Sequence, residues 1–267
     1  MISHSHQTLL IQASIGLHAF AAGAVTMNPK WWPMALATLV ADHAVITGSG
    51  LWPRSTWLGP NLRRLPDEAA ARRQVALTID DGPDPVVTPR VLDALDAHGL
   101  KATFFCLGIR VVEHAALARE IVKRGHAIEN HSYIHRHDFS LLGPGGYERE
   151  VSTAQRVIAD TVGSVPTFFR APAGLRNVFL QAVLARHGLS LTSWTRRGFD
   201  AVRGDPDRVS RSLLSGLAAG DILLMHDGNA ARTPAGEPVI LEVLPRLADA
   251  LREAKLAAVT LRGACAT

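Results

Sequence analysis

The sequence predicts an α/β protein, a distorted (β/α)7 barrel preceded by an apolar helical hairpin. Seven short apolar stretches after Arg73 alternate with helical patterns of ten or more residues. The chain has 267 residues, and α/β barrels of about 200 to 250 residues are commonly one domain. The first fifty residues carry almost no charge. We therefore expect a membrane-associated segment at 1–60, a linker at 61–73 and a barrel at 74–267.

The N-terminal segment contains two apolar runs of membrane-spanning length. Residues 1–29 contain no Asp, Glu, Lys or Arg, and residues 31–51 carry one charge, Asp42. Each run has about the 20 residues that a helix needs to cross a bilayer. Tryptophans flank the second run, as interface anchors do: Trp31, Trp32, Trp52 and Trp57. We expect residues 8–51 to form a membrane hairpin.

Polar residues interrupt these runs, so two helices packed on the soluble body stay open as an alternative. The interruptions are Gln12, His18, Asp42 and His43. A secretory signal fits less well, because no basic residue precedes the apolar stretch.

The charges that flank the runs also predict an orientation. The turn between the runs offers only Lys30, whereas five arginines follow the second run: Arg54, Arg63, Arg64, Arg72 and Arg73. Such an excess marks the cytoplasmic side. We expect a bacterial-type inner-membrane protein whose C-terminal domain faces the cytoplasm, with a soluble cytoplasmic or periplasmic protein as the alternative.

The barrel begins with a strand at Gln74–Ile79, an apolar run that ends on two adjacent acids and Gly82-Pro83. Its helix is predicted from Thr88 as N-cap to a stop at Gly99. The further strands are expected at Ala102–Leu107, Ala127–Glu129, Thr167–Phe169, Leu189–Trp194, Asp221–Met225 and Ala257–Leu261. The further helices are expected before Gly125 and at Tyr147–Val162, Asn177–His187, Pro206–Ala219 and Glu237–Lys255.

Chemically active side chains follow the carboxyl ends of these strands, which share one face of a parallel barrel. They are Asp80, Asp81, His131, His135, Arg170, Asp200 and His226.

Two pairs among these residues suggest a metal centre. Asp80 and Asp81 are adjacent like charges, which become tolerable beside a cation or when one carboxylate keeps a proton. His131 and His135 are four residues apart and can point at one centre in a helix or a tight turn, although solvated loop histidines would look the same. With Asp81 they make a three-ligand set with an open position, typical of a catalytic zinc-type site. Asp80 is then the carboxylate left to accept a proton.

Five ordered motifs carry a family resemblance: Thr78–Asp84, His131–His135, Arg170–Gly174, Trp194–Asp200 and Leu224–His226. They resemble the motifs of the polysaccharide deacetylases, the NodB-homology proteins also called carbohydrate esterase family 4. The resemblance covers roughly 74–261 and leaves the hairpin outside.

The resemblance implies a role for each matching position. Asp80 would be the general base, Arg170 would orient it, and His226, paired with Asp200, would be the general acid. Asp81, His131 and His135 would bind a divalent metal, with Zn²⁺ favoured over Co²⁺, Ni²⁺ or Mn²⁺. Three further residues are expected at the oxyanion or substrate: Ala173 through a nearby backbone amide, Trp194 and Arg197. Asp227 stays open as an alternative partner of the imidazole.

The implied activity is removal of an N-acetyl group from an amino sugar. An O-acetyl esterase with the same centre and a non-catalytic carbohydrate-binding protein on the same fold are the alternatives. The third motif has Ala171 and Ala173 in place of the usual Pro and aromatic residue. In the fourth motif, Arg196 and Arg197 put positive charge near the rim of the site. With a membrane hairpin, that charge favours a phosphate-bearing or lipid-linked amino sugar.

Composition predicts few other partners. The net charge of +4 comes from scattered arginines without a basic run, so nucleic-acid binding has little support, and no protein partner is predicted. The two cysteines, Cys106 and Cys265, make no disulfide framework, although a single bridge between them stays open.

Overall fold

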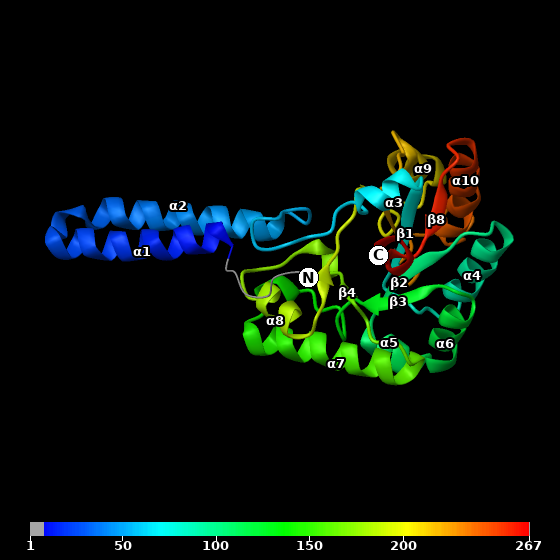
Figure 1. Cartoon of the computed structure of the whole chain (residues 1–267), viewed down its shortest axis with the longest axis horizontal. Coiled ribbons are helices and arrows are strands. Elements are labelled where there is room, and N and C mark those ends of the chain that lie inside the picture. Colours follow the sequence, from blue (N-terminus) through cyan, green and yellow to red (C-terminus); the bar gives the residue numbers. More distant parts are fainter. Residues whose placement is uncertain (1–7, 267) are drawn as a thin grey trace.

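The computed structural model describes residues 8–266 and contains one parallel sheet curled into an incomplete barrel (Figure 1). Residues 1–7 of the predicted N-terminal segment, and residue 267, lie outside the described residues. The strands follow the order β5-β4-β3-β2-β1-β7-β6, and β8 pairs with β1. Their bounds are β1 Gln74–Asp80, β2 Ala102–Cys106, β3 Ala127–Asn130, β4 Phe168–Phe169, β5 Ser190–Leu191, β6 Arg196–Arg197, β7 Ile222–His226 and β8 Ala257–Val259. The predicted fold class is confirmed.

Strand β1 lies inside the sheet and is buried on both faces, with only its first residue partly exposed. It pairs in parallel with β2 and β7, in a register that places Asp80 beside Phe105 and His226. The mouth of this strand therefore brings residues from three strands together.

Helices cover the outer face of the sheet (Figure 1). Their bounds are α3 Asp67–Ala71, α4 Val87–Ala97, α5 Gly108–Glu113, α6 Ala115–Lys123, α7 Pro144–Val162, α8 Leu180–Arg186, α9 Pro206–Leu214, α10 Val239–Glu253 and α11 Leu261–Cys265. Thr88, predicted to cap the first barrel helix, lies inside α4, and Asp84 Oδ1 accepts from the amides of Val86 and Val87 instead. The Thr88 hydroxyl donates a hydrogen bond to Asp227, which only the tertiary fold brings near.

Three elements were not predicted: the short strand β6 and helices α3 and α11. Strand β6 is two residues long and pairs with β7. The stretch 61–73, predicted as a linker, contains α3 and forms bridges from Leu62 to Thr192 and from Arg64 to Asp221. It therefore adds to the sheet. Both cysteines are free.

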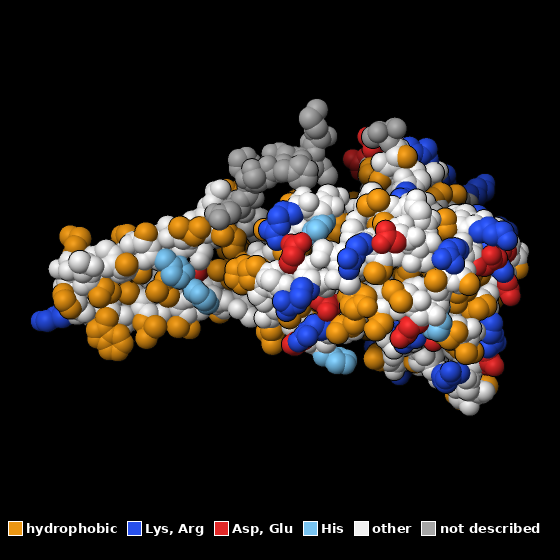
Figure 2. Space-filling view, turned by 90° about the horizontal axis from the view of Figure 1, so that it is seen from below, with side chains coloured by type: hydrophobic (Ala, Val, Ile, Leu, Met, Phe, Trp, Pro, Cys, Tyr) orange, Lys and Arg blue, Asp and Glu red, His pale blue; other side chains and the backbone are white. Residues whose placement is uncertain are grey.

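The N-terminal hairpin consists of α1 Leu9–Met27, the 3-10 turn η1 Pro29–Trp31 and α2 Trp32–Leu51. It extends away from the barrel as a rod, and its surface is mostly apolar (Figures 1 and 2). Both helices are long and apolar enough to cross a membrane, and only 11% of each span is buried inside the protein. The two helices contact each other through a hydrogen bond from Ser14 Oγ to Asp42 Oδ2, 2.6 Å long. This arrangement differs from the alternative in which both helices pack on the body.

The base of the hairpin is joined to the barrel by a buried arginine. Arg176 donates its backbone amide to the carbonyl of Gly50 and its guanidinium to that of Ser55, at 3.1 and 2.7 Å. Burial lowers the pKa of Arg176 to about 10, with the Tyr147 hydroxyl acting weakly in the opposite direction. The hairpin therefore leaves the barrel from a fixed point.

Candidate active site

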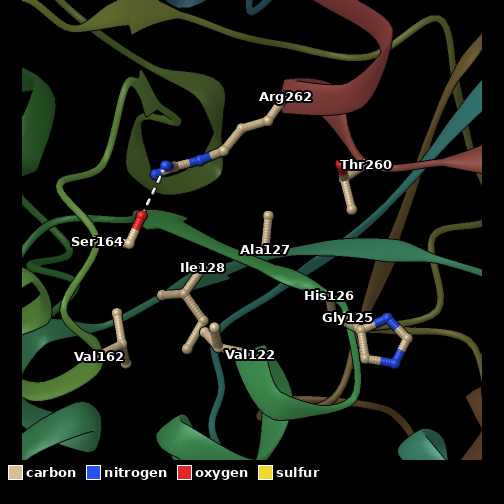
Figure 3. Close-up of a pocket in the computed structure, with 9 residues that line it drawn as sticks. All are labelled: Val122, Gly125, His126, Ala127, Ile128, Val162, Ser164, Thr260 and Arg262. Atoms are coloured by element: carbon tan, nitrogen blue, oxygen red, sulfur yellow. Dashed lines mark hydrogen bonds between the residues drawn. The ribbon is translucent and has the colours of Figure 1, made fainter.

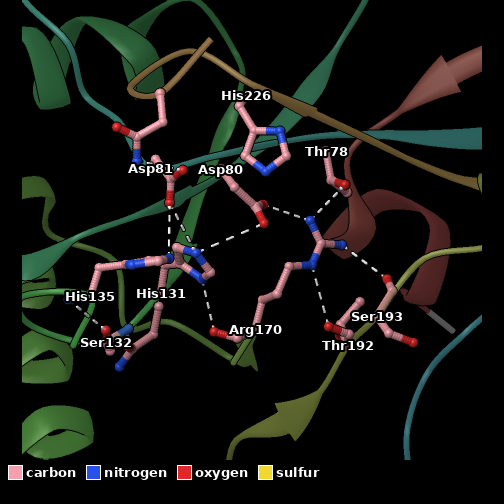
Figure 4. A network of polar contacts seen from close by, with 12 residues as sticks. Thr78, Asp80, Asp81, His131, Ser132, His135, Arg170, Thr192, Ser193 and His226 are labelled. Atoms are coloured by element: carbon pink, nitrogen blue, oxygen red, sulfur yellow. Dashed lines mark hydrogen bonds and ion pairs between the residues drawn. The ribbon is translucent and has the colours of Figure 1, made fainter. Parts of the chain in front are cut away.

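The chemically active side chains converge at the carboxyl ends of β1, β3, β4 and β7 (Figure 4). Asp80 lies at the centre of the picture, with the two histidines of the loop after β3 on one side and Arg170 on the other. His226 approaches the same carboxylate from β7. Residues up to 146 positions apart thus form one site only because parallel strands end at one edge.

Asp81, His131 and His135 form the predicted cluster. Asp81 Oδ1 lies 3.2 Å from His131 Nε2 and 3.5 Å from His135 Nε2. The other nitrogen of His131, Nδ1, donates to the carbonyl of Arg170 at 2.8 Å, which directs Nε2 into the cluster. Burial raises the pKa of Asp81, but the imidazoles outweigh it, His131 most, and hold the pKa well below its ordinary value. The carboxylate is therefore anionic.

The loop that carries the two histidines is a tight turn held by side chains. Glu150 on α7 accepts from the backbone amides of Tyr133 and Ile134, and Ser132 Oγ accepts from the amide of His135. These bonds bend the loop so that residues four apart face one centre without a helix.

Backbone strain concentrates around the site. Most of the non-glycine residues with positive φ lie here, and such conformations persist only where the surroundings impose them. They are Asp81 at φ 78°, Ser132 at 71°, His135 at 53°, Ala173 at 53° and Phe199 at 62°.

Asp80 is paired with a buried arginine. Arg170 donates from Nη1 to Asp80 Oδ1 at 2.6 Å and to the Thr78 hydroxyl at 2.8 Å, and it is 1% exposed. Its remaining donors reach the carbonyls of Thr192 and Ser193. Burial lowers the pKa of Arg170 although the charge of Asp80 opposes this. Because one oxygen of Asp80 is held, the other is the one left to accept a proton.

His226 is paired with Asp200. Its Nδ1 lies 3.0 Å from Asp200 Oδ1, and its backbone amide donates to Asp200 Oδ2 at 2.7 Å. Burial alone would lower the pKa of His226, but the hydrogen bond and charge of Asp200 outweigh it and raise the pKa to about 9. The alternative partner, Asp227, accepts from Thr88 instead, at 2.5 Å, and lies against Gly82, where a Cβ would meet its carboxyl group.

The three residues predicted at the oxyanion or substrate lie beside this network. Ala173 sits in the 3-10 turn η3 Pro172–Gly174, just after Arg170. The Trp194 ring lies between two guanidiniums, with the Cζ atoms of Arg170 and Arg197 5.9 and 5.4 Å from its centroid. The structure places all three at the mouth of the barrel, and their contact with a substrate stays a prediction.

Arg196 departs from the expectation that it adds charge beside the site. Its guanidinium pairs with Asp221 at 2.5 Å and donates to the carbonyls of Ser215 and Gly216. The residue therefore joins β6 to the end of α9, and it shares the Asp221 carboxylate with Arg64, whose Nη1 lies 2.8 Å from Asp221 Oδ1.

Sequence reasoning missed the residues that support the site from outside. Asn229 donates to Asp81 Oδ2 at 2.9 Å, and Glu150 holds the histidine loop. Asn229 follows the last motif by three residues, and this proximity is the one signal in the sequence that could have pointed to it. Glu150 lies within an ordinary amphipathic helix and carries no such signal.

The side chains fit a divalent cation. Three ligand atoms from Asp81, His131 and His135 lie within 4.8 Å of one another. Asp81 Oδ1 is buried and, among the described residues, no hydrogen-bond donor satisfies it. An orphaned anionic oxygen facing two imidazoles is the donor set of a zinc-type site with a free position.

Comparisons with known proteins agree with this geometry. Residues 67–192 match the family model described as polysaccharide deacetylase. A chitooligosaccharide deacetylase of Bradyrhizobium sp. (strain ANU 289) is 38% identical over 168 residues, which cover 62% of this chain and 76% of that protein. The Bc1960 peptidoglycan N-acetylglucosamine deacetylase superposes with a TM-score of 0.68 at 25% identity, covering 76% of this chain and 91% of the other. The acetyl xylan esterase of Clostridium thermocellum, solved with a cobalt ion, gives 0.63 at 30% identity, with coverages of 72% and 89%.

Proposed function

Since this chain belongs to the polysaccharide deacetylase family, we propose that it is a metal-dependent hydrolase that removes an N-acetyl group from an amino sugar of a glycan. The observation that carries the proposal is the placement of Asp80 between the Asp81, His131 and His135 cluster, Arg170 and His226. Hydrolysis of an amide needs an activated water, stabilisation of an oxyanion and an acid for a poor leaving group, and this set supplies each.

Asp81, His131 and His135 would hold the metal, and two imidazoles with one carboxylate favour Zn²⁺. When bound, the cation would polarise the amide carbonyl and make a nearby water easier to deprotonate. We expect Co²⁺, Ni²⁺ or Mn²⁺ to substitute to differing degrees. The measurement is acetate release after removal of the metal and addition of each ion, which ranks the ions by the activity that they restore.

Asp80 takes the proton of the attacking water. Arg170 occupies Oδ1, so the proton goes to Oδ2, and the guanidinium keeps the carboxylate oriented. The water oxygen bonds to the acetyl carbon, and negative charge develops on the carbonyl oxygen. A backbone amide near Ala173, in the turn η3, would stabilise that charge.

His226 supplies the second proton. Asp200 holds Nδ1 and leaves Nε2 to face the reaction. The carbon–nitrogen bond breaks as the amine takes the proton from His226, and the products are acetate and the free amino sugar. Protonation of the nitrogen matters because an unprotonated amine is a poor leaving group.

The esterase alternative rests on the similarity to the acetyl xylan esterase. The experiment compares chitotetraose with an acetylated xylooligosaccharide, using wild type and His226→Ala. If the N-acetyl substrate is the natural one, it is the better substrate of the wild type and the variant loses more activity on it than on the ester, since without a proton donor an alkoxide leaves more easily than the anion of an amine. Faster wild-type turnover of the ester would favour the esterase, and no turnover of either substrate would contradict the proposal.

The hairpin would anchor the enzyme in a membrane. Its length, its apolar surface and the Trp residues at its ends support this role. The arginines that follow α2 favour a cytoplasmic barrel at a bacterial-type inner membrane. In this arrangement residues 1–60 form the anchor, and 61–73 lead into a catalytic barrel at 74–267.

A further inference from the structure

A groove of about 390 Å³ lies between the base of the hairpin and the mouth of the barrel. Trp52, Pro53 and Arg54, which follow α2, line one side. Its other side includes Trp194, Arg197 and Phe199. The chain thus builds a hollow from the end of the membrane segment and from a loop that reaches the catalytic residues.

Two arginines that line this groove, Arg54 and Arg197, have no ion pair among the described residues, and Arg203 lies next to the groove without lining it. Arg197 lies 4.0 Å over the Phe199 ring, and Arg203 lies 4.6 Å over the same ring. Within residues 8–266, ion pairs hold Arg196 to Asp221, whereas none involves Arg54, Arg197 or Arg203. Aromatic rings orient these guanidiniums but leave their outer edges free to donate. Guanidiniums held this way match a phosphate, which takes paired hydrogen bonds from Arg.

The Trp194 side chain connects the groove with the catalytic network. Trp194 lines the groove, and its ring centroid lies 5.4 Å from Cζ of Arg197 and 5.9 Å from Cζ of Arg170, the partner of Asp80. Phe199 directly precedes Asp200, which holds His226. A sugar whose acetamido group reaches Asp80 would therefore place a substituent of the neighbouring carbon toward Arg197.

The groove also opens where the membrane boundary is expected. Trp52 and Trp57 are 58% and 56% exposed at the end of α2, as interfacial tryptophans are. A lipid whose tail runs along the hairpin would thus place its phosphate beside these arginines.

We propose that this groove binds the phosphate of a lipid-linked amino sugar, so that the substrate is an N-acetylated sugar joined to a membrane lipid through a phosphate. The inference rests on the proposed deacetylase function and names its substrate class. A neutral polymer uses neither the free arginines nor the exit toward the hairpin.

A second hollow, of about 210 Å³, offers no comparable site (Figure 3). It lies near the start of β3, and its one arginine, Arg262, donates to Glu129, Ser164 and the carbonyl of Val165. That guanidinium is already satisfied.

The first test measures selectivity of the full chain in detergent. One probe is N-acetylglucosamine joined through a 1-phosphate to a short prenol. The other is the uncharged, fully N-acetylated chitotriose. We expect wild type to prefer the first, and Arg197→Gln to lower the ratio of the two kcat/KM values by about ten- to a hundredfold, the size of a lost charged hydrogen bond. Arg203→Gln should lower it less. The matched control is Arg156→Gln on α7, which is exposed and unpaired among the described residues and should leave the ratio unchanged.

The second test separates the substrate phosphate from a bilayer headgroup and does not depend on turnover. N-acetylglucosamine 1-phosphate is titrated calorimetrically into Asp80→Asn protein with and without Arg197→Gln, and both proteins are also mixed with vesicles containing phosphatidylglycerol. Loss of sugar-phosphate binding supports the proposal. Weaker vesicle binding with unchanged sugar-phosphate binding overturns it in favour of a headgroup site.

The outcomes also distinguish the two proposals of function. Good turnover of chitotriose without a preference for the phosphate-linked probe overturns the groove assignment and leaves the deacetylase function standing. No turnover of either probe overturns both.

Discussion

The division of labour between Asp80 and Asp81 is decided by their partners. Adjacent in sequence, the two carboxylates point to different neighbours: Asp80 to Arg170, and Asp81 to the two histidines and Asn229. The strained φ of Asp81 turns the chain between them. One peptide bond therefore separates the proposed metal ligand from the proposed proton acceptor.

Replacing the general base tests this division. Asp80→Asn keeps the shape of the side chain and can still contact Arg170, but it cannot take a proton. We expect kcat to fall by about 10²- to 10⁴-fold, while the zinc content measured by mass spectrometry stays near that of wild type. Equal loss of metal and activity would show that Asp80 is a ligand.

The pairing of His226 with Asp200 predicts a pH dependence. Because the pKa of His226 is raised to about 9, its acid form persists through neutral pH and is lost as the pH rises past that value. Asp200→Asn removes the charge that raises the pKa, so burial would then lower it. The alkaline limb of the kcat/KM profile should move to lower pH, whereas exposed Asp207→Asn should leave it unchanged. An unmoved limb in Asp200→Asn would assign the acid role elsewhere.

Asn229 is expected to tune metal affinity without touching the metal. Its bond to Asp81 Oδ2 leaves Oδ1 turned toward the histidines. Asn229→Ala should weaken Zn²⁺ binding by about ten- to a hundredfold, as loss of a supporting partner does. Competition with a chelating dye measures this. The melting temperature of the metal-free protein should change little, because Asn229 is exposed.

At the scale of elements, the hairpin base and the turn η3 depend on each other. Gly174 has φ +75°, and a Cβ there would lie 2.6 Å from Pro53 Cβ and 2.8 Å from the Trp194 ring. The absent side chain allows the chain that follows α2 to pack against the turn that follows Arg170. The hairpin therefore positions the rim of the site.

Gly174→Ala should be destabilising for two reasons, its positive φ and its contacts. The control is Gly163→Ala, which has φ +70° with nothing near the added atom. We expect the control to cost about 1 kcal/mol and Gly174→Ala about 1 to 3 kcal/mol more, measured as melting temperatures in detergent. Activity should fall only in Gly174→Ala. Equal melting temperatures would mean that the hairpin base moves aside freely.

Elements with a strong local pattern were predicted well, and the others were not. Strand β1 and helix α7 follow from an apolar run and from a long amphipathic repeat. Strand β6 contains two arginines, and it is a strand because Arg196 and Arg197 pair with β7. No local pattern marks such an element, since its bonds come from residues that are distant in sequence.

At the scale of the molecule, the hairpin, the groove and the barrel mouth form one continuous path. Both ends of the hairpin lie at the barrel, and its turn lies far from it (Figure 1). With the hairpin in a membrane, the site would face the surface of the bilayer. A tethered enzyme of this shape suits a substrate held in the same membrane.

The orientation of that path can be measured in cells. Fusion of green fluorescent protein after Thr267 should give fluorescence, and fusion of alkaline phosphatase at the same place should give little activity, if the arginines that follow α2 hold the barrel in the cytoplasm as we propose. The matched fusion in the turn after Asn28 should give the opposite result. Active phosphatase at the C-terminus would reverse the topology.

The sequence by itself determined the fold class, the apolar hairpin and the order of the chemically active residues, because periodicity and motif spacing are local properties of a chain. Only the tertiary structure decided that Asp200 rather than Asp227 holds His226, that Arg196 pairs with Asp221 while Arg197 has no ion pair among the described residues, and that Asn229 supports Asp81. The reason is physical: hydrogen bonds and ion pairs depend on distances of a few ångströms between side chains from different strands. Those distances are set by strand register and loop strain, which no local pattern encodes.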